Sequence, residues 1–244
     1  MGQAWTFAKR EVSPDQLGRV LAELAGPDLL GINLTLPLKQ AAFQFVSQVT
    51  PEAEQIGAIN CLRWTGQHWE GHNSDATGWL DSFEEEIGLP LQGRKTLVIG
   101  AGGACRAILA ALRRQQIGPL AIFNRTPERS QSLLRPGDLS LRLDDFASHL
   151  EADCLVVQTT SVGMWPHTES SPVEWPQPLP PGVIACDLVY NPSPTRWLAQ
   201  ADQGGARTLD GCGMLVHQAV RAIEWWSGLR PDPACMLRAL KDSL

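Results

Sequence analysis

Residues Thr96 to Arg129 carry the strongest structural signal in the chain and read TLVIGAGGACRAILAALRRQQIGPLAIFNRTPER. The apolar run Thr96–Ile99 predicts a buried strand, which leads into a glycine-rich turn. Apolar residues then recur at helical spacing, and a second apolar run follows at Leu120–Phe123. Strand, glycine turn, helix and strand form the βαβ unit of a dinucleotide site, in which glycines let the backbone approach a pyrophosphate at the helix start. The residues of the turn are Gly100, Ala101, Gly102, Gly103 and Ala104.

The residues after the second strand indicate which dinucleotide fits. A site for NAD carries Asp or Glu there for the ribose hydroxyls. This chain instead has Asn124, Arg125 and Thr126, followed by Arg129. A guanidinium offers a planar fork of donors that suits a phosphate, so the pattern predicts NADP. The alternative is a surface arginine on a Rossmann unit that holds no nucleotide.

Composition sets broad limits on the class of protein. The 244 residues suffice for one large domain or two modest ones. A net charge of −6 gives no electrostatic footprint for nucleic acid or an anionic membrane. The 6 cysteines include no CxxC pair, which favours reduced thiols in a cytoplasmic protein. The sequence does not decide between a monomer and a homodimer.

The rest of the chain lies before and after the βαβ unit at Thr96 to Arg129. Residues 1–90 alternate predicted helices and strands, including a short strand at Trp5–Ala8, a strand at Leu29–Leu36 and a hairpin over residues 61–71. Residues 89–93 are the expected linker into a parallel-sheet domain, with further strands at Cys154–Val157 and Ile184–Val189. Residues 165–182 hold 6 prolines and predict an extended surface loop. Two C-terminal helices complete the chain.

Two polar residues stand out in the first ninety. Lys39 lies in the first turn of a predicted helix opened by Pro37, where the helix dipole disfavours a cation. Asp75 lies at another predicted helix start, where an acid is favoured. Taken alone, Lys39 is also compatible with a solvated surface lysine, and Asp75 with a simple cap residue.

Ordered motifs along the chain resemble those of the shikimate dehydrogenase family, from about Trp5 to the C-terminus. The matching segments are Gly31–Lys39, Gly57–Asn60, Gly71–Asp75 with Gly78, Gly100–Ala104, Asn124–Thr126, Thr160–Met164, Asp187–Pro192, and Asp210–Met214 with Gln218. The resemblance implies an α/β fold of two domains: an N-terminal substrate domain (1–90) and a Rossmann-type NADP domain with a parallel sheet (93–212). The C-terminal helices (213–244) would return to the first domain.

The resemblance also implies an activity and site residues. The family interconverts 3-dehydroshikimate and shikimate with NADP, in chorismate and aromatic amino acid biosynthesis. Lys39 would be the catalytic acid/base, and Asp75 would bond the same reacting hydroxyl. The substrate contacts would be Thr35, Lys39, Asn60, Asp75, Tyr190 and Gln218. NADP would be held by Gly100 to Ala104, Asn124, Arg125, Thr126 and Arg129, with the backbone near Leu188 and Gly211 beside the nicotinamide; no metal is implied.

The chain departs from the family pattern at its start. The family begins with a strand and a Ser-x-Ser-Pro turn that holds the substrate carboxylate, and Ser13–Pro14 is better explained as a helix cap. We therefore expect that the true start of the protein lies further upstream. The alternative, which we favour less, is that the chain is a divergent relative of the family. Gln158 and Thr159 also replace the common Asn-Ala near the cofactor, with an expected effect on its fit.

Three other functions compete with this interpretation. A relative that binds NADP without catalysis would fit a chain that cannot seat substrate. A sister dehydrogenase acting on quinate would differ by one hydroxyl of the substrate. A dehydrogenase acting on a folate is disfavoured by the pattern of Asn60 and Asp75.

Overall fold

The computed structural model describes residues 5–244, which form two compact units. Unit 1 comprises the described residues up to Ser74 together with Ala219–Pro233, and unit 2 comprises Asp75–Gln218 together with Ala234–Leu244. The division at Ser74 precedes the expected linker, because helix α4 (Asp75–Glu86) packs on helix α5 (Gly103–Arg114) within unit 2. Nowhere in residues 5–244 does a helix combine the length and apolar character needed to cross a membrane.

Unit 1 is built on a four-stranded sheet in the order β1-β3-β4-β2. The predicted hairpin is confirmed: β3 and β4 pair antiparallel with Leu62 opposite Gly71, and β1 pairs antiparallel with β3. β2 runs parallel to β4. The strands are β1 (Ile32–Asn33), β2 (Gln48–Val49), β3 (Cys61–Trp64) and β4 (Trp69–His72).

Short helices pack on this sheet around buried apolar residues such as Leu17, Ile59 and Leu62. They are a 3-10 turn at Pro14–Gln16, α1 (Leu17–Leu24), α2 (Leu38–Ala41), a 3-10 turn at Ala42–Phe45, and α3 (Pro51–Ile56). Ser13 precedes the first turn, and its N–H donates to the Gln16 side chain, as expected of a helix cap.

Two predicted strands of unit 1 are wrong or too long. Residues 5–8 form no strand, and Phe7 is 76% exposed, so these apolar residues have no sheet to enter. The run Leu29–Leu36 contributes only β1, since the hydrogen-bonded register with β3 covers just Ile32 and Asn33.

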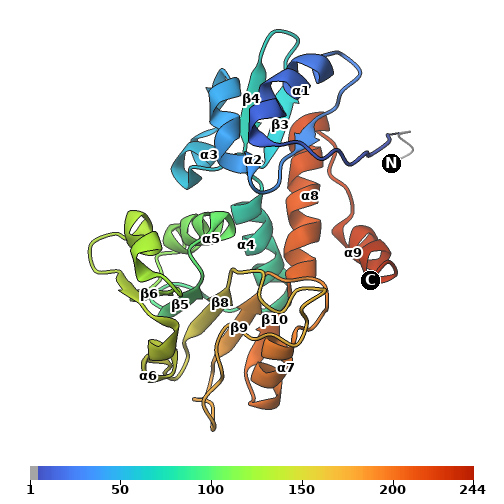
Figure 1. Ribbon diagram of the computed structural model, residues 1–244. Helices are drawn as coiled ribbons and strands as arrows, with labels where there is room; N and C mark the ends of the chain where they lie inside the picture. The colour runs from blue at the N-terminus through green and yellow to red at the C-terminus, as the bar shows by residue number, and fades with distance from the viewer. Residues whose placement is uncertain (1–4) are drawn as a thin grey trace. The chain divides into compact units, whose positions relative to one another are not determined.

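Unit 2 contains a six-stranded, fully parallel sheet in the order β10-β9-β8-β5-β6-β7 (Figure 1). The four central strands are buried at every position, as expected of a sheet covered on both faces. The strands are β5 (Thr96–Ile99), β6 (Leu120–Phe123), β7 (Leu139–Leu141), β8 (Leu155–Gln158), β9 (Ile184–Asp187) and β10 (Arg207–Leu209). The predicted Rossmann-type architecture is confirmed.

The helices of unit 2 follow the alternation of a βαβ fold, and α7 packs against β9 and β10 (Figure 1). Besides α4 and α5, the elements are 3-10 segments at Pro127–Leu133 and Leu143–Asp145, α6 (Phe146–His149) and α7 (Arg196–Gln203).

The C-terminal helices are α8 (Gly211–Ser227) and α9 (Pro233–Lys241). The second half of α8, from Ala219, belongs to unit 1, whereas α9 belongs to unit 2 from Ala234 onward. This differs from the expected return of all of residues 213–244 to the first domain. Lys241 of α9 acts electrostatically on Glu86 of α4, an attraction that joins α9 to unit 2.

The proline-rich segment 165–182 is only in part a surface loop. Trp175 in its middle is buried and stacks on Trp197 of α7 with ring centroids 4.7 Å apart. The Trp175 indole N–H also donates to the Trp197 carbonyl at 2.9 Å. The segment is therefore anchored in the core of unit 2 at its midpoint. All 6 cysteines are free, and only Cys235 among them is exposed.

Candidate functional site

The glycine-rich turn joins β5 to α5 at the carboxyl edge of the parallel sheet. Gly100 has a φ of 103°, a conformation that favours glycine, and a Cβ there would lie 2.8 Å from the Thr159 hydroxyl. A Cβ on Gly102, by contrast, would meet nothing within 4 Å. The start of the 12-residue α5 thus lies open, and its first N–H groups can bind an anion.

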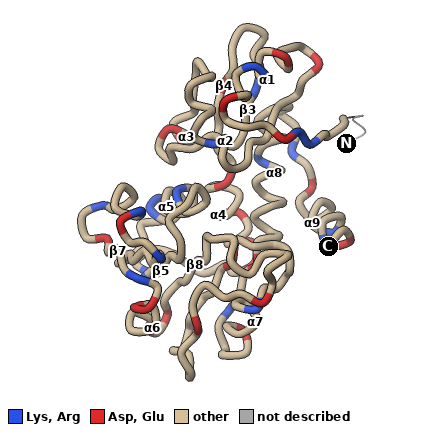
Figure 2. The backbone as a smooth tube through the Cα atoms, in the orientation of Figure 1, with Lys and Arg blue, Asp and Glu red and all other residues tan. Residues whose placement is uncertain are grey.

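The segment after β6 offers amide and guanidinium donors. The Asn124 side chain donates to the Thr126 carbonyl at 2.7 Å, which fixes the turn that leaves the strand. Arg125 and Arg129 are exposed beyond it, and Figure 2 shows basic residues on α5 and on the segment that follows β6. No carboxylate directly follows β6 in the sequence, so these residues fit a phosphorylated ribose better than free ribose hydroxyls.

A second loop, at the end of β8, contacts the glycine turn. The backbone N–H and the hydroxyl of Thr159 both donate to the Ile99 carbonyl, at 2.9 and 2.8 Å. The Gln158 side chain donates to the Val162 carbonyl at 3.1 Å and accepts from the Thr160 N–H. Burial raises the pKa of the Cys105 thiol beneath this loop to about 12, so this thiol stays protonated. Thr159 therefore fixes the loop to the end of β5 before the glycine turn, and the Gln158 side chain fixes the loop internally.

A third loop follows β9 and carries Leu188 and Tyr190. The Leu188 N–H donates to the Gln158 carbonyl at 3.1 Å, and the Gly211 N–H donates to the Val189 carbonyl at 3.1 Å. A Cβ on Gly211 would clash with the Leu188 carbonyl oxygen, so only glycine permits this approach. The structure thus brings Leu188 and Gly211 together, and it leaves the Tyr190 side chain exposed.

Asp187, the last residue of β9, supports this third loop and was not among the predicted site residues. It is 1% exposed, and burial is the main reason that its pKa is raised to about 6. The charge of Asp210 acts in the same direction, whereas hydrogen bonds from Thr195 and Val189 oppose it. The signal in the sequence was a carboxylate that interrupts the apolar run Ile184–Val189.

Unit 1 brings Thr35, Lys39 and Asn60 onto adjoining segments. The Leu34 N–H donates to the Asn60 carbonyl at 2.8 Å, and the Ile59 N–H donates to the Lys39 carbonyl at 2.8 Å. Thr35 is exposed and Lys39 is half-buried. Because α2 is a single turn of 4 residues, the dipole expected to disfavour a cation at Lys39 is small.

Asn60 is tied to the residue before Asp75. Its side-chain oxygen accepts from the Ser74 N–H at 2.9 Å, and its amide donates to the Ser74 hydroxyl at 3.1 Å. Asn60 is only 2% exposed, so both ends of its amide serve the backbone that leads into α4. The Asn73 side chain adds a bond to the Ala58 carbonyl at 2.8 Å.

Asp75 and Gln218 lie on neighbouring helices of unit 2. A Cβ on Gly78 would lie 2.5 Å from the Gln218 backbone nitrogen, so α4 and α8 touch at this point. Gly78 follows Asp75 by three residues and therefore shares its face of α4. Lys39 belongs to unit 1, and Asp75 begins unit 2.

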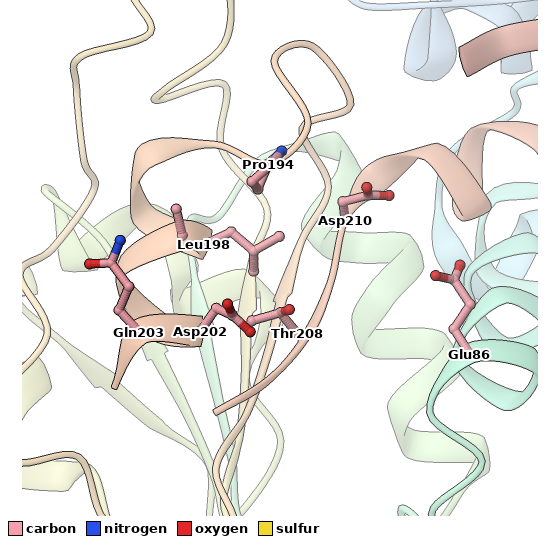
Figure 3. A pocket seen from close by; sticks show the side chains of 8 residues that line it. Glu86, Pro194, Leu198, Asp202, Gln203, Thr208 and Asp210 are labelled. Atoms are coloured by element: carbon pink, nitrogen blue, oxygen red, sulfur yellow. The ribbon is translucent and has the colours of Figure 1, made fainter. Parts of the chain in front are cut away.

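A cavity of about 350 Å³ lies between α7, β10 and the end of α4, and Pro194 of the third loop also lines it (Figure 3). Its charged lining consists of Glu86, Asp202 and Asp210, and Figure 3 shows the Glu86 side chain approaching from α4. Burial, followed by the charge of Asp210, raises the pKa of Glu86. An acidic lining repels phosphate, so this cavity does not fit a dinucleotide.

The sequence of this chain matches family models and known proteins. The model of the shikimate dehydrogenase substrate binding domain matches residues 1–62, that of shikimate / quinate 5-dehydrogenase matches 83–170, and that of the shikimate 5'-dehydrogenase C-terminal domain matches 211–241. The shikimate dehydrogenase (NADP(+)) of Geobacillus kaustophilus is 37% identical over 239 residues, which cover 96% of this chain and 86% of that protein. The chain belongs to the shikimate dehydrogenase family.

Solved structures agree with this family membership. The shikimate 5-dehydrogenase of Thermus thermophilus, in complex with NADP(H) and shikimate, superposes with a TM-score of 0.83 at 36% identity, covering 96% of this chain and 86% of that one. The ligand-free 5-ketofructose reductase of a Gluconobacter strain superposes with a TM-score of 0.78 at 25% identity, covering 96% and 86%. The shikimate dehydrogenase fold therefore occurs in proteins named for different substrates, and the substrate must be argued from the site.

Proposed function

We propose that this chain is an NADP-dependent oxidoreductase that interconverts shikimate and 3-dehydroshikimate. The observation that carries the proposal is the glycine turn at the open start of α5, followed after β6 by Asn124 and Arg125 rather than an acid, in a chain of the shikimate dehydrogenase family. The names of its relatives support the substrate.

The residues of unit 2 suit the cofactor. The turn Gly100–Ala104 would hold the pyrophosphate against the N–H groups of α5. Asn124, Arg125, Thr126 and Arg129 would hold the ribose phosphate, because guanidinium groups bind phosphate through two parallel bonds. The backbone at Leu188 and Gly211 would face the nicotinamide. The bound cofactor supplies hydride acceptance and return, which no side chain of the chain can provide.

Lys39 and Asp75 would perform the proton chemistry. When shikimate is oxidised, its hydroxyl must lose a proton, and we propose that the Lys39 amine accepts it. Asp75 would accept a hydrogen bond from the same hydroxyl and orient it. Thr35, Asn60, Tyr190 and Gln218 would hold the rest of the ring, with Asn60 acting in part through its bonds to Ser74. In the reverse direction Lys39 returns the proton to the carbonyl oxygen.

A cytoplasmic location of the reaction is part of the proposal. All 6 cysteines are free, and reduced thiols support a cytoplasmic location. The placement of the reaction in chorismate and aromatic amino acid biosynthesis rests on the family. A homodimer stays a prediction, which light scattering of the purified chain would test.

A steady-state assay of the full chain tests the proposal. Shikimate with NADP+ should give reduced cofactor, while NAD+ in its place should give a kcat/KM at least about tenfold lower, because the arginine contacts have no phosphate to bind. Quinate and reduced 5-ketofructose serve as parallel substrates. A higher kcat/KM on quinate would favour the sister activity. Binding of NADP+ without turnover of any substrate in either direction would favour the non-catalytic relative.

A further inference from the structure

A buried carboxylate, Asp187, makes two of the hydrogen bonds that hold the loop after β9. Asp187 Oδ1 accepts from the Val189 N–H at 2.9 Å, and Oδ2 accepts from the Thr195 hydroxyl at 2.6 Å. Thr195 is the N-cap of α7, and its hydroxyl also accepts from the Leu198 N–H at 3.2 Å. Asp187 therefore binds residues at both ends of the loop formed by residues 188–194 and connects it to α7.

Burying a carboxylate is costly unless its oxygens are hydrogen-bonded. Asp187 and Thr195 are each 1% exposed, so solvent does not stabilise this charge. One bond of the carboxylate holds Val189 in the loop that carries Leu188 and Tyr190, and the other holds Thr195 directly after that loop. A charged acceptor also makes stronger hydrogen bonds than a neutral one, so the Asp187 carboxylate can fix a short loop with two bonds.

We propose that Asp187 is a positioning residue for the reaction: it fixes residues 188–194 so that the Leu188 backbone and the Tyr190 side chain take up their places. The roles of Leu188 and Tyr190 rest on the proposed function, whereas the hold on the loop does not. Asp187 itself touches neither substrate nor cofactor in this scheme. It acts through Val189 and Thr195.

Three variants separate this role from a general loss of stability. Asp187→Ala removes both acceptors, and Thr195→Val removes the hydroxyl while keeping the shape of the side chain. Thr195→Ser keeps the hydroxyl and should therefore have the amide exchange rates and the kcat of the wild type. If Asp187→Ala does not fold, the pair of Thr195 variants still tests whether the hydroxyl that bonds Asp187 and caps α7 holds the loop.

Asp138 provides the matched control. Its carboxylate accepts from the Arg135 N–H at 2.8 Å and from Arg113 at 2.6 Å, and its side chain is only 14% exposed. It precedes β7 at the amino edge of the same parallel sheet, away from the loop that follows β9. Asp138→Ala thus removes a similarly bonded carboxylate of unit 2 without touching residues 188–194.

Two readouts are needed on the full-length protein. Amide hydrogen exchange without ligands should be about tenfold faster or more at residues 188–194 in Asp187→Ala and Thr195→Val, as the loss of one or two hydrogen bonds implies. With shikimate and NADP+, kcat should fall about tenfold or more. The Kd for NADP+ should change less than about threefold, because its phosphates bind elsewhere. Thr195→Ser and Asp138→Ala should match the wild type in loop exchange and kcat.

The outcomes distinguish this proposal from the proposed function. If Asp187→Ala and Thr195→Val match Asp138→Ala in loop exchange and in kcat, the positioning role is wrong. Faster exchange with an unchanged kcat would also overturn it, because the loop would then be held without consequence for the reaction. If the wild type turns over neither shikimate nor its ketone, the proposed function fails, and loop exchange alone still decides whether Asp187 holds the loop.

Discussion

Lys39 is the side chain on which the proposed proton transfer depends. Lys39→Ala should lower kcat by a factor of about 10² to 10⁴, the usual cost of losing a positioned acid/base. The Kd for NADP+, measured by titration without shikimate, should stay within about twofold, because the phosphates bind in unit 2 whereas Lys39 belongs to unit 1.

Lys9 is the control for this change, since it is an exposed lysine of the same unit to which no role is given. Lys9→Ala should leave kcat within about twofold of the wild type, as expected of a surface substitution. A similar kcat for Lys39→Ala would refute the acid/base role. Parallel loss of turnover and of NADP+ binding would indicate unfolding instead.

Arg125 should set the preference between the two dinucleotides. Arg125→Gln should raise the KM for NADP+ by about tenfold or more, because a charge-assisted bond to phosphate contributes about 1.5–3 kcal/mol. The kcat/KM for NAD+ should hardly change, since NAD+ lacks this phosphate. Arg135→Gln, at an exposed arginine before β7, should alter neither value. Equal losses with both dinucleotides would argue against phosphate recognition by Arg125.

At the scale of elements, the contact between α4 and α8 depends on Gly78. A Cβ there would lie 2.5 Å from a backbone atom of Gln218, which cannot move without shifting α8. Overpacking of this kind typically costs about 1–3 kcal/mol, and the higher helix propensity of alanine returns at most about 1 kcal/mol. Gly78→Ala should therefore lower the free energy of unfolding, measured with urea, and should also lower kcat because Asp75 and Gln218 flank the contact.

Two other glycines calibrate this prediction. A Cβ on Gly213 would meet the ends of the Ser82 and Glu86 side chains, which can rotate away, so Gly213→Ala should cost less than Gly78→Ala. A Cβ on Gly26 would meet nothing within 4 Å, and Gly26→Ala should change stability by no more than about 0.5 kcal/mol. Equal stability of all three variants would mean that α4 and α8 do not pack this closely.

The elements that the sequence predicted well are those with strong local signals. β5, β6 and the hairpin follow from uninterrupted apolar or alternating runs bounded by glycine or asparagine. β7 and β10 were missed because each has 3 residues at an edge of the sheet, where little burial shapes the sequence. Trp175 was missed because prolines mark a loop locally, whereas its burial depends on the distant Trp197.

In the candidate site, too, local motifs could be predicted from the sequence and long-range contacts could not. The glycine turn and Asn124–Arg129 are local motifs, and the sequence alone identified them. Asp187 was missed because its importance arises from its bond to Thr195, which lies 8 residues further along the chain, at the start of α7. The buried bonds of Asn60 to Ser74 were likewise hidden, since 14 residues separate the two.

At the scale of the whole molecule, the units are not continuous in sequence, because the chain enters unit 2 at Asp75 and α8 spans Gln218 and Ala219. Composition marks a linker at residues 89–93, but packing decides the division: α4 lies on α5 and α8 touches α4. The composition of residues 89–93 therefore identifies a segment between secondary-structure elements. The unit to which α4 belongs is decided by the contacts of that helix.

The stability of the whole chain should carry a pH dependence that originates at Asp187. The pKa of this carboxyl is raised from 3.8 to about 6 in the folded protein, mainly by burial. Between these values the folded state binds more protons than the unfolded state, so the contribution of Asp187 to the free energy of unfolding falls as pH rises from about 4 to about 6. A pKa difference of this size corresponds to roughly 3 kcal/mol.

Asp187→Asn isolates this contribution, because the amide keeps an oxygen for the Val189 N–H but does not titrate. Urea unfolding of both proteins from pH 4 to pH 7 gives the difference between their free energies of unfolding at each pH. We expect the wild type to lose stability relative to Asp187→Asn as pH rises through this window, and the difference to level off above about pH 6. A constant difference would mean that Asp187 does not titrate there, and a difference of opposite slope would mean that its hydrogen bonds outweigh its burial.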